Sequence, residues 1–266
     1  MRIMLTNDDG IRAPGILALH EAINGLGDEL RVIAPRTVQS ATSHGVTFHK
    51  PLQVHEVEVN QSMSGLAVDG RPADCVKLAI TTLWEDLYGG TPDLVISGMN
   101  AGVNVGIHII YSGTVGAAIE AAFLGVPAIA VSLHFHDFAS IRWDLAGRFA
   151  REAIDRVLAT DLLKPHSVIN INIPVTEGDL PADEPAPDLR VVPMNLAAVR
   201  DRYLSRGFPA GQRYYWINGD GLEFHDTAEG SDVEAIMDRF ITVTPLQYDL
   251  TAHREMETWR KRLGGV

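Results

Sequence analysis

Short apolar segments alternate with segments of helical periodicity from the first residues to about Pro174, and this alternation constrains the fold more than any other feature. Such an order is typical of an α/β protein with a mostly parallel sheet, because each parallel pair of strands needs a long crossover between its members. Five segments read as strands and four as helices. The expected strands are Arg2–Thr6, Leu30–Ala34, Asp93–Ser97, Ala128–Leu133 and Val168–Ile173, and the expected helices are Pro14–Asn24, Ala73–Leu87, Thr114–Phe123 and Ala146–Val157. We therefore predict a Rossmann-like sheet with helices on both faces.

The chain changes character after residue 180. Pro181–Asp188 is rich in proline and acidic residues, as linkers are. Beyond it, Arg190–Pro193, Tyr214–Asn218 and Phe240–Pro245 read as strands of a separate β-rich arm. The arm has few apolar residues, so we expect it to pack on a partner subunit. The predicted division is a core over residues 1–180 and a C-terminal arm and oligomerisation segment over 181–266.

The charge and composition narrow the function classes. The chain has 34 acidic and 22 basic residues, a net charge of −12, which argues against binding to nucleic-acid polymers. Its apolar residues form no run approaching the roughly 18 that a membrane-spanning helix needs. One cysteine, Cys75, excludes a disulfide framework within the chain. With the first strand expected at Arg2, leaving no room for a signal peptide, we expect a cytoplasmic location.

Polar residues follow the predicted strands. In an open parallel sheet, ligands lie outside the carboxyl ends of the strands. Asp8 and Asp9 come directly after the first strand, and two adjacent carboxylates suit a hard cation such as Mg²⁺ or Mn²⁺. An ordinary Asn-Asp-Asp-Gly turn explains the same residues equally well. The position after the first strand favours the metal site.

The segment Ser112-Gly113-Thr114 opens a predicted helix. Free N–H groups at a helix N-terminus bind anions, and glycine lets a ligand approach the backbone. A simple helix cap is the more common use of such residues. The loop from Ser97 to Gly106 adds three glycines and two asparagines, Asn100 and Asn104, but it is not followed by the Gly-Lys-Ser/Thr of a Walker loop.

The remaining candidates are weaker. His134 and His136 flank Phe135 and could form a metal pair, although a His-x-His at a strand end more often faces solvent. His44 and His108 stand in segments that could line a cleft. Cys75 falls on an apolar helix stripe and is expected in the core. The absence of a Gly-x-Ser-x-Gly sequence argues against a serine hydrolase.

Several motifs together resemble one family, the SurE nucleotidases (survival protein E, 5′/3′-nucleotidase), over nearly the whole chain. The matching segments are Leu5–Gly10, Ala13–Gly15, Ala34–Pro35 with Ser40, Ser97–Asn104, Tyr111–Val115, Ser231–Asp232 and Ile241–Leu246. The resemblance implies a Rossmann-like core that binds one divalent metal ion and removes phosphate from nucleoside 5′-monophosphates, with 3′-monophosphates as a second class. It also implies a homodimer or homotetramer that exchanges its C-terminal arms.

The resemblance assigns roles to eight residues. By motif position, the metal ligands are Asp8, Asp9, Ser40 and Asn100. Phosphate contacts fall at Asn104, Ser112, Gly113 and Thr114. Of the two catalytic aspartates, Asp8 would orient or deprotonate the attacking water and Asp9 would anchor the metal. The metal and the helix terminus would supply the local positive potential that the net charge lacks.

Two other functions remain open from the sequence. The chain could be a broad phosphatase or exopolyphosphatase for which nucleotides are incidental. It could also be a non-catalytic module that binds nucleotides or metal in the same pocket. A panel of phosphate substrates distinguishes a broad phosphatase from a nucleotidase. Tight nucleotide binding without phosphate release would favour the non-catalytic module.

Overall fold

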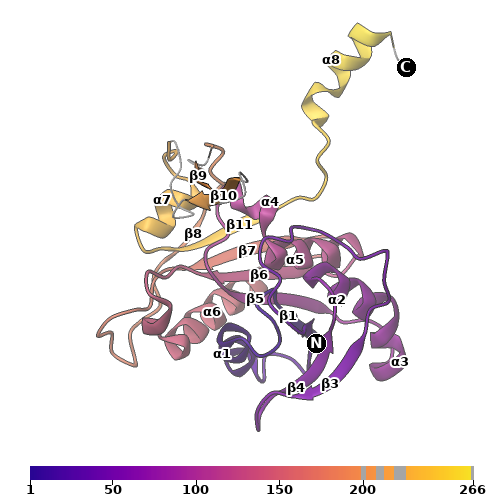
Figure 1. The fold of residues 1–266 in the computed structure, drawn as a ribbon, viewed down its shortest axis with the longest axis vertical. Coiled ribbons are helices and arrows are strands. Elements are labelled where there is room, and N and C mark those ends of the chain that lie inside the picture. The colour runs from indigo at the N-terminus through magenta and orange to yellow at the C-terminus, as the bar shows by residue number, and fades with distance from the viewer. Residues whose placement is uncertain (199–201, 208–212, 219–225, 265–266) are drawn as a thin grey trace.

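The fold is an open α/β sheet with helices on both faces, seen in a computed structural model that describes residues 1–198, 202–207, 213–218 and 226–264 (Figure 1). Nine strands lie in the order β3-β4-β2-β1-β5-β6-β7-β11-β8. Their bounds are β1 Arg2–Thr6, β2 Glu29–Pro35, β3 Val54–Glu58, β4 Ser64–Val68, β5 Leu94–Ala101, β6 Ala128–Leu133, β7 Val168–Ile173, β8 Leu189–Val191 and β11 Ile241–Leu246. Six neighbouring strands of the sheet, β4, β2, β1, β5, β6 and β7, pair in parallel. This confirms the predicted fold class.

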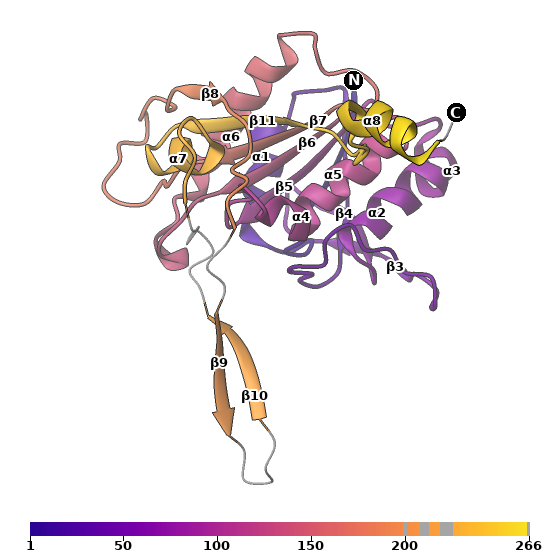
Figure 2. The same ribbon diagram turned by 90° about the horizontal axis from the view of Figure 1, so that it is seen from above.

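Five helices pack apolar side chains against the two faces of the sheet. Helices α1 and α6 cover one face, and α2, α3 and α5 cover the other (Figures 1 and 2). Their bounds are α1 Pro14–Ile23, α2 Pro72–Leu78, α3 Trp84–Tyr88, α5 Gly113–Phe123 and α6 Trp143–Leu158; a π-helical turn, Ala79–Leu83, joins α2 to α3. Pro14 and Pro72 each stand at the first helical turn, where the missing N–H breaks no hydrogen bond. Cys75 is buried, as expected.

Strand β5 continues past the predicted end at Ser97. The pairing with β6 shifts register between Ser97 and Asn100, and Asn100 and Ala101 then pair with Ser132 and Leu133. Gly98 lies at this irregularity with φ +148°, and a Cβ there would stand 2.3 Å from the carbonyl oxygen of Val131. Only glycine fits this position. The segment expected as a loop therefore begins as an irregular strand end. This places Asn100 at the carboxyl end of the parallel strands.

Two of the three strands assigned to a separate arm belong to the main sheet instead. Strand β11 pairs antiparallel with β7, and β8 pairs parallel with β11. Without β11, the edge of β7 would expose unpaired backbone groups. Only β10 (Arg213–Asn218) stands apart, in an antiparallel hairpin with β9 (Arg202–Gly207) that projects from the body in Figure 2. Residues 199–201, 208–212, 219–225 and 265–266 of the predicted arm lie outside the described residues.

The other helices of the described residues are α4 (His108–Tyr111), a 3-10 helix (Phe138–Ser140), α7 (Asp232–Met237) and α8 (His253–Leu263). Helix α8 extends away from the body in Figure 1 and has no buried residue. No described helix is both long and apolar enough to cross a membrane.

Candidate active site

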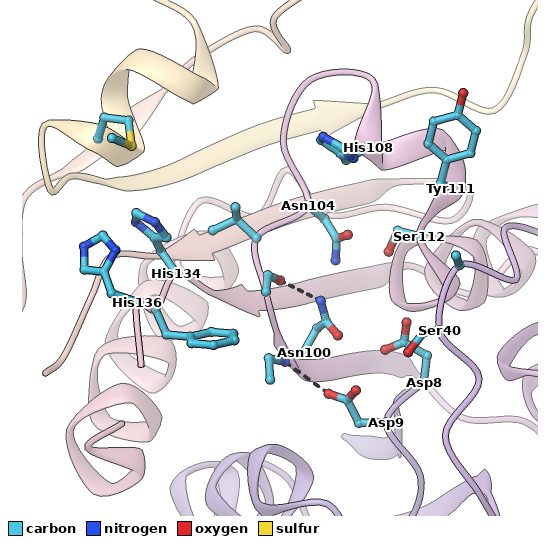
Figure 3. A pocket seen from close by; sticks show the side chains of 16 residues that line it. Asp8, Asp9, Ser40, Asn100, Asn104, His108, Tyr111, Ser112, His134 and His136 are labelled. Atoms are coloured by element: carbon cyan, nitrogen blue, oxygen red, sulfur yellow. Dashed lines mark hydrogen bonds between the residues drawn. The ribbon is translucent and has the colours of Figure 1, made fainter. Parts of the chain in front are cut away.

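A cavity of about 710 Å³ lies at the carboxyl edge of the parallel strands. Six of the eight predicted site residues line it, and Figure 3 shows their side chains around one space. The six are Asp8, Asp9, Ser40, Asn100, Asn104 and Ser112. They come from the turn after β1, the end of β5, the segments after β2 and β5, and the start of α5, so the topology brings together residues that are far apart in sequence.

The carboxylates of Asp8 and Asp9 lie together on the cavity, and no basic side chain in the described part of the chain is paired to them. Asp8 is 5% exposed, and burial raises its pKa to about 6, with the neighbouring Asp9 charge adding to the rise. Burial also raises the pKa of Asp9. Among the described residues, no lysine or arginine forms an ion pair with either carboxylate. Two partly desolvated acids without a cationic partner are the environment that a bound cation would stabilise.

Thr114 holds Asp8 rather than lining the cavity. Its hydroxyl donates to Oδ1 of Asp8, and this hydrogen bond opposes the rise of the Asp8 pKa. Gly113 allows the close approach, because a Cβ there would stand 3.0 Å from both Cβ and Oδ2 of Asp8. The structure therefore places Gly113 and Thr114 in contact with Asp8, and the phosphate contacts expected of them stay a prediction.

Ser112 caps the N-terminus of α5. Its Oγ accepts a hydrogen bond of 3.0 Å from the backbone N–H of Val115. With its oxygen used as an acceptor inside the protein, the hydroxyl proton is available to a ligand in the cavity. The helix N-terminus adds a positive end of the peptide dipoles at the same point.

Asn104 is fixed by polar side chains that the sequence analysis missed. Its Nδ2 donates to Ser132 Oγ at 2.7 Å, and its N–H donates to Asn172 Oδ1 at 2.8 Å. Its carbonyl oxygen accepts from Asn170 and Asn172. The signal was present in Val168–Ile173, because two asparagines in a strand with apolar neighbours are costly unless they are hydrogen-bonded.

Asp9 and Asn100 are held by the end of β5. Asp9 Oδ2 accepts from the N–H of Ala101 at 3.1 Å, and Asn100 Nδ2 donates to the carbonyl oxygen of Gly102 at 2.6 Å (Figure 3). No described residue donates a hydrogen bond to the side-chain oxygen of Asn100, so this oxygen can act as a ligand. Ser40 is an exposed residue in the segment after β2.

The donor set fits a hard divalent cation. The structure shows no group of three or more His, Cys, Asp or Glu side chains able to hold a metal within its described residues. The candidate set is different in kind: two carboxylates, one hydroxyl and one amide oxygen, all on one cavity. Oxygen ligands of this mixture suit Mg²⁺ and Mn²⁺.

The histidines divide between the cavity and the surface. His108, His134 and His136 line the cavity, and the rings of His134 and His136 stand 5.0 Å apart at an interplanar angle of 69°. His44 lies elsewhere, with Nε2 2.6 Å from the buried carboxylate of Glu120. Glu120 also accepts from Lys77 at 2.7 Å, and neither contact was expected from the sequence.

The fold and the cavity define a class: a Rossmann-like α/β protein with an acidic, oxygen-lined site at the carboxyl edge of its sheet. The family model described as survival protein SurE matches residues 3–199. The chain belongs to the SurE family, which confirms the resemblance carried by the motifs.

Relatives match over the full length. A protein of Carboxydothermus hydrogenoformans called 5′-nucleotidase SurE is 39% identical over 275 residues, covering 100% of this chain and 98% of the relative. One of Solidesulfovibrio magneticus with the same name is 41% identical over 264 residues, covering 99% and 98%. The crystal structure of the SurE protein from Aquifex aeolicus superposes with a TM-score of 0.80 at 33% identity, covering 99% of this chain and 100% of that one.

Proposed function

We propose that the chain is a divalent-metal-dependent phosphomonoesterase that hydrolyses nucleoside 5′-monophosphates, with 3′-monophosphates as a second class of substrate. The observation that carries this proposal is the convergence of Asp8, Asp9, Ser40 and Asn100 on one cavity beside the capped N-terminus of α5. Full-length relatives called 5′-nucleotidase SurE support the choice of nucleotides.

Asp8, Asp9, Ser40 and Asn100 would hold one Mg²⁺ or Mn²⁺ ion. When bound, the ion offsets the charge of the two carboxylates and stabilises negative charge on the phosphoryl oxygens. The contact from Ala101 N–H fixes Asp9, and Asn100 is fixed through Gly102. Both side chains are therefore placed before a ligand arrives.

Asp8 would act as the general base. Thr114 fixes Oδ1, so one carboxylate oxygen is held while the carboxylate takes a proton from the attacking water. Without a cation, burial raises the pKa of Asp8 to about 6; a bound cation would lower this pKa and keep the carboxylate ionised, as a base must be. As the bond from water to phosphorus forms, the bond to the ribose oxygen breaks, and the proton held by Asp8 passes to the leaving alcohol.

Ser112 and Asn104 would hold the phosphoryl oxygens. The Ser112 hydroxyl has a proton to donate, and the start of α5 presents its positive end to the same place. Asn104 is only 6% exposed and is held by four hydrogen bonds, so it needs little reorganisation to receive charge.

The test is phosphate release from a panel of nucleoside 5′- and 3′-monophosphates with Mn²⁺, Mg²⁺ or a chelator. We expect metal-dependent release by the wild type, at least a hundredfold loss in Asp9→Asn, and no loss in Asp86→Asn, a matched change on the exposed side of α3. Full activity after exhaustive chelation would exclude the metal. Tight nucleotide binding by a folded protein that releases no phosphate would favour a binding module.

Within the predicted segment 181–266, we propose that the β9–β10 hairpin and α8 form an oligomerisation arm that makes a homodimer or homotetramer, while β8 and β11 belong to the core sheet. Its support is the exposure of large apolar side chains on the hairpin and α8: Tyr203, Tyr215, Trp216, Ile217, Trp259 and Leu263 are each at least 56% exposed. Such a surface is typical of an interface. The solution mass by light scattering tests it, with Trp216→Ser expected to weaken assembly and a monomeric wild type counting against it.

A further inference from the structure

The cavity has two chemically different ends. Asp8, Ser40 and Ser112 stand at one end and His134 and His136 at the other, with Asn100 and Asn104 between them (Figure 3). At about 710 Å³, it has the size of a cavity for a whole small molecule. A metal ion and a phosphate group account for the acidic end alone. The end with the two histidines is therefore open to the rest of a substrate.

The wall at the histidine end carries no carboxylate. The consecutive residues His134, Phe135 and His136 line the cavity there, and its lining also includes Val103 and Met237. Three of the five have flat rings and two are aliphatic. A surface of this kind suits a planar heterocycle, which stacks on rings and forms few, directional hydrogen bonds.

This wall is fixed before any ligand binds. The N–H of His134 donates to the carbonyl oxygen of Ile173 at 2.8 Å, continuing the pairing of β6 with β7. Glu177 accepts from the N–H of His136 at 2.5 Å and from that of Asp137 at 3.1 Å. The ring of Phe135 packs edge-to-face on Phe138, with centroids 5.9 Å apart.

His134 has the chemistry of a selective hydrogen-bonding group. It is only 8% exposed, and burial lowers its pKa, with His136 adding to the fall and Glu177 opposing it. A neutral imidazole offers one donor and one acceptor, which matches the mixed edge of a nucleobase or a ribose hydroxyl.

Tyr111 is the other aromatic residue on the cavity, and it is a poorer candidate. Its side chain is 54% exposed, and in Figure 3 its hydroxyl points away from Asp8 and Asp9. It also stands beside Ser112, at the end of the cavity that would hold phosphate. A nucleoside stacked on Tyr111 would leave the histidine end empty.

We propose that His134–Phe135–His136, the segment after β6, is the nucleoside-binding wall of the site: the base stacks on Phe135, and the two imidazoles bind the polar edges of the nucleoside. This inference rests on the proposed function and adds to it the residues that distinguish a nucleotide from other phosphate monoesters. The wall contacts the leaving group and takes no part in bond breaking.

The test is the ratio of kcat/KM for adenosine 5′-monophosphate to kcat/KM for glycerol 3-phosphate, measured with Mn²⁺. Loss of one stacked base predicts a fall of roughly 5- to 150-fold in this ratio for Phe135→Ala, carried mainly by KM for the nucleotide. Phe135→Trp keeps a stacking face and should retain the preference. His136→Ala, at an exposed position, should lower the ratio without altering the melting temperature.

Two controls separate this inference from its alternatives. Phe48→Ala removes the same side chain at a position 78% exposed and outside this cavity, and it should leave the ratio unchanged. Equal losses for both substrates in Phe135→Ala, or a preference that depends on Tyr111 instead, would overturn the inference while the enzyme remains a nucleotidase. A wild type that hydrolyses no monoester with any metal would overturn the proposed function itself, and this inference with it.

Discussion

The hydroxyl of Thr114 donates to the carboxylate of Asp8, across 106 positions of sequence, and so joins the start of α5 to the turn after β1. Thr114 is fully buried and its hydroxyl positions Asp8, while the phosphate contact expected from its motif stays a prediction. Removing the hydroxyl should therefore impair Asp8 and spare the fold.

Thr114→Val should lower kcat roughly 10- to 100-fold, because a hydrogen bond to a charged group contributes about 1.5–3 kcal/mol. The valine has a similar shape, so the protein should stay folded. The measurement is steady-state phosphate release together with thermal melting. Thr81→Val is the matched control, since its hydroxyl donates to the Lys77 carbonyl on an exposed helix face, and it should remain fully active.

Asp8→Asn should abolish turnover and at the same time stabilise the metal-free protein. Burial raises the pKa of Asp8 from 3.8 to about 6, so the charged carboxylate costs the folded state stability above pH 6, whereas below pH 3.8 the group is protonated in both states. At pH 8 with a chelator, the variant should gain up to roughly 3 kcal/mol in free energy of unfolding. The gain in free energy of unfolding should shrink as the pH falls toward 4, as urea titrations at several pH values would show. A gain that does not change with pH would contradict a raised pKa of Asp8 as its cause.

Gly113→Ala should displace Asp8. The added Cβ would stand 3.0 Å from Asp8 Cβ and Oδ2 and 3.1 Å from Pro72 Cγ, which is closer than ordinary contact. Overpacking of this kind costs about 1–3 kcal/mol, and we expect at least a tenfold loss of kcat/KM. Gly207→Ala, where a Cβ meets nothing within 4 Å, is the control. An active Gly113→Ala enzyme would show that Asp8 need not stay in its present position.

Glu120→Gln should destabilise the protein by about 1–3 kcal/mol near neutral pH. Burial by itself would raise the pKa of Glu120, but hydrogen bonds from His44 and Lys77 outweigh it and lower the pKa below 4.5. This stabilisation is present above pH 4.5 and is lost as the pH falls through the lower folded-state pKa. The difference between wild type and variant in urea unfolding should therefore vanish in acid.

Because His44 lies four residues after Ser40, the same Glu120→Gln change should also loosen the segment that carries Ser40 and weaken Mn²⁺ binding in calorimetry. Glu152→Gln, on the exposed side of α6, should alter neither stability nor metal affinity. A stability loss that is independent of pH would count against the ion pairs as its cause.

The local features of the sequence predicted much of this fold. The five central strands and the helices between them follow from apolar periodicity and from Pro14, Gly125 and Pro127 as boundary residues. Strands β3 and β4 were missed because the alternating, half-exposed pattern of Val54–Glu58 is weak outside its sheet. The position of β11 beside β7 was missed because strand order is a long-range property.

The sequence by itself determined the alternation of strands and helices, the polar residues at the strand ends, and the family to which the chain belongs, since each depends on residues close together in the chain. Three features depend on the tertiary structure alone. Thr114 donates a hydrogen bond to Asp8, Asn170 and Asn172 donate to Asn104, and His134 and His136 line the same cavity as Asp8. These are contacts between separate strands and helices, and they arise only when the parallel sheet brings its carboxyl ends to one edge.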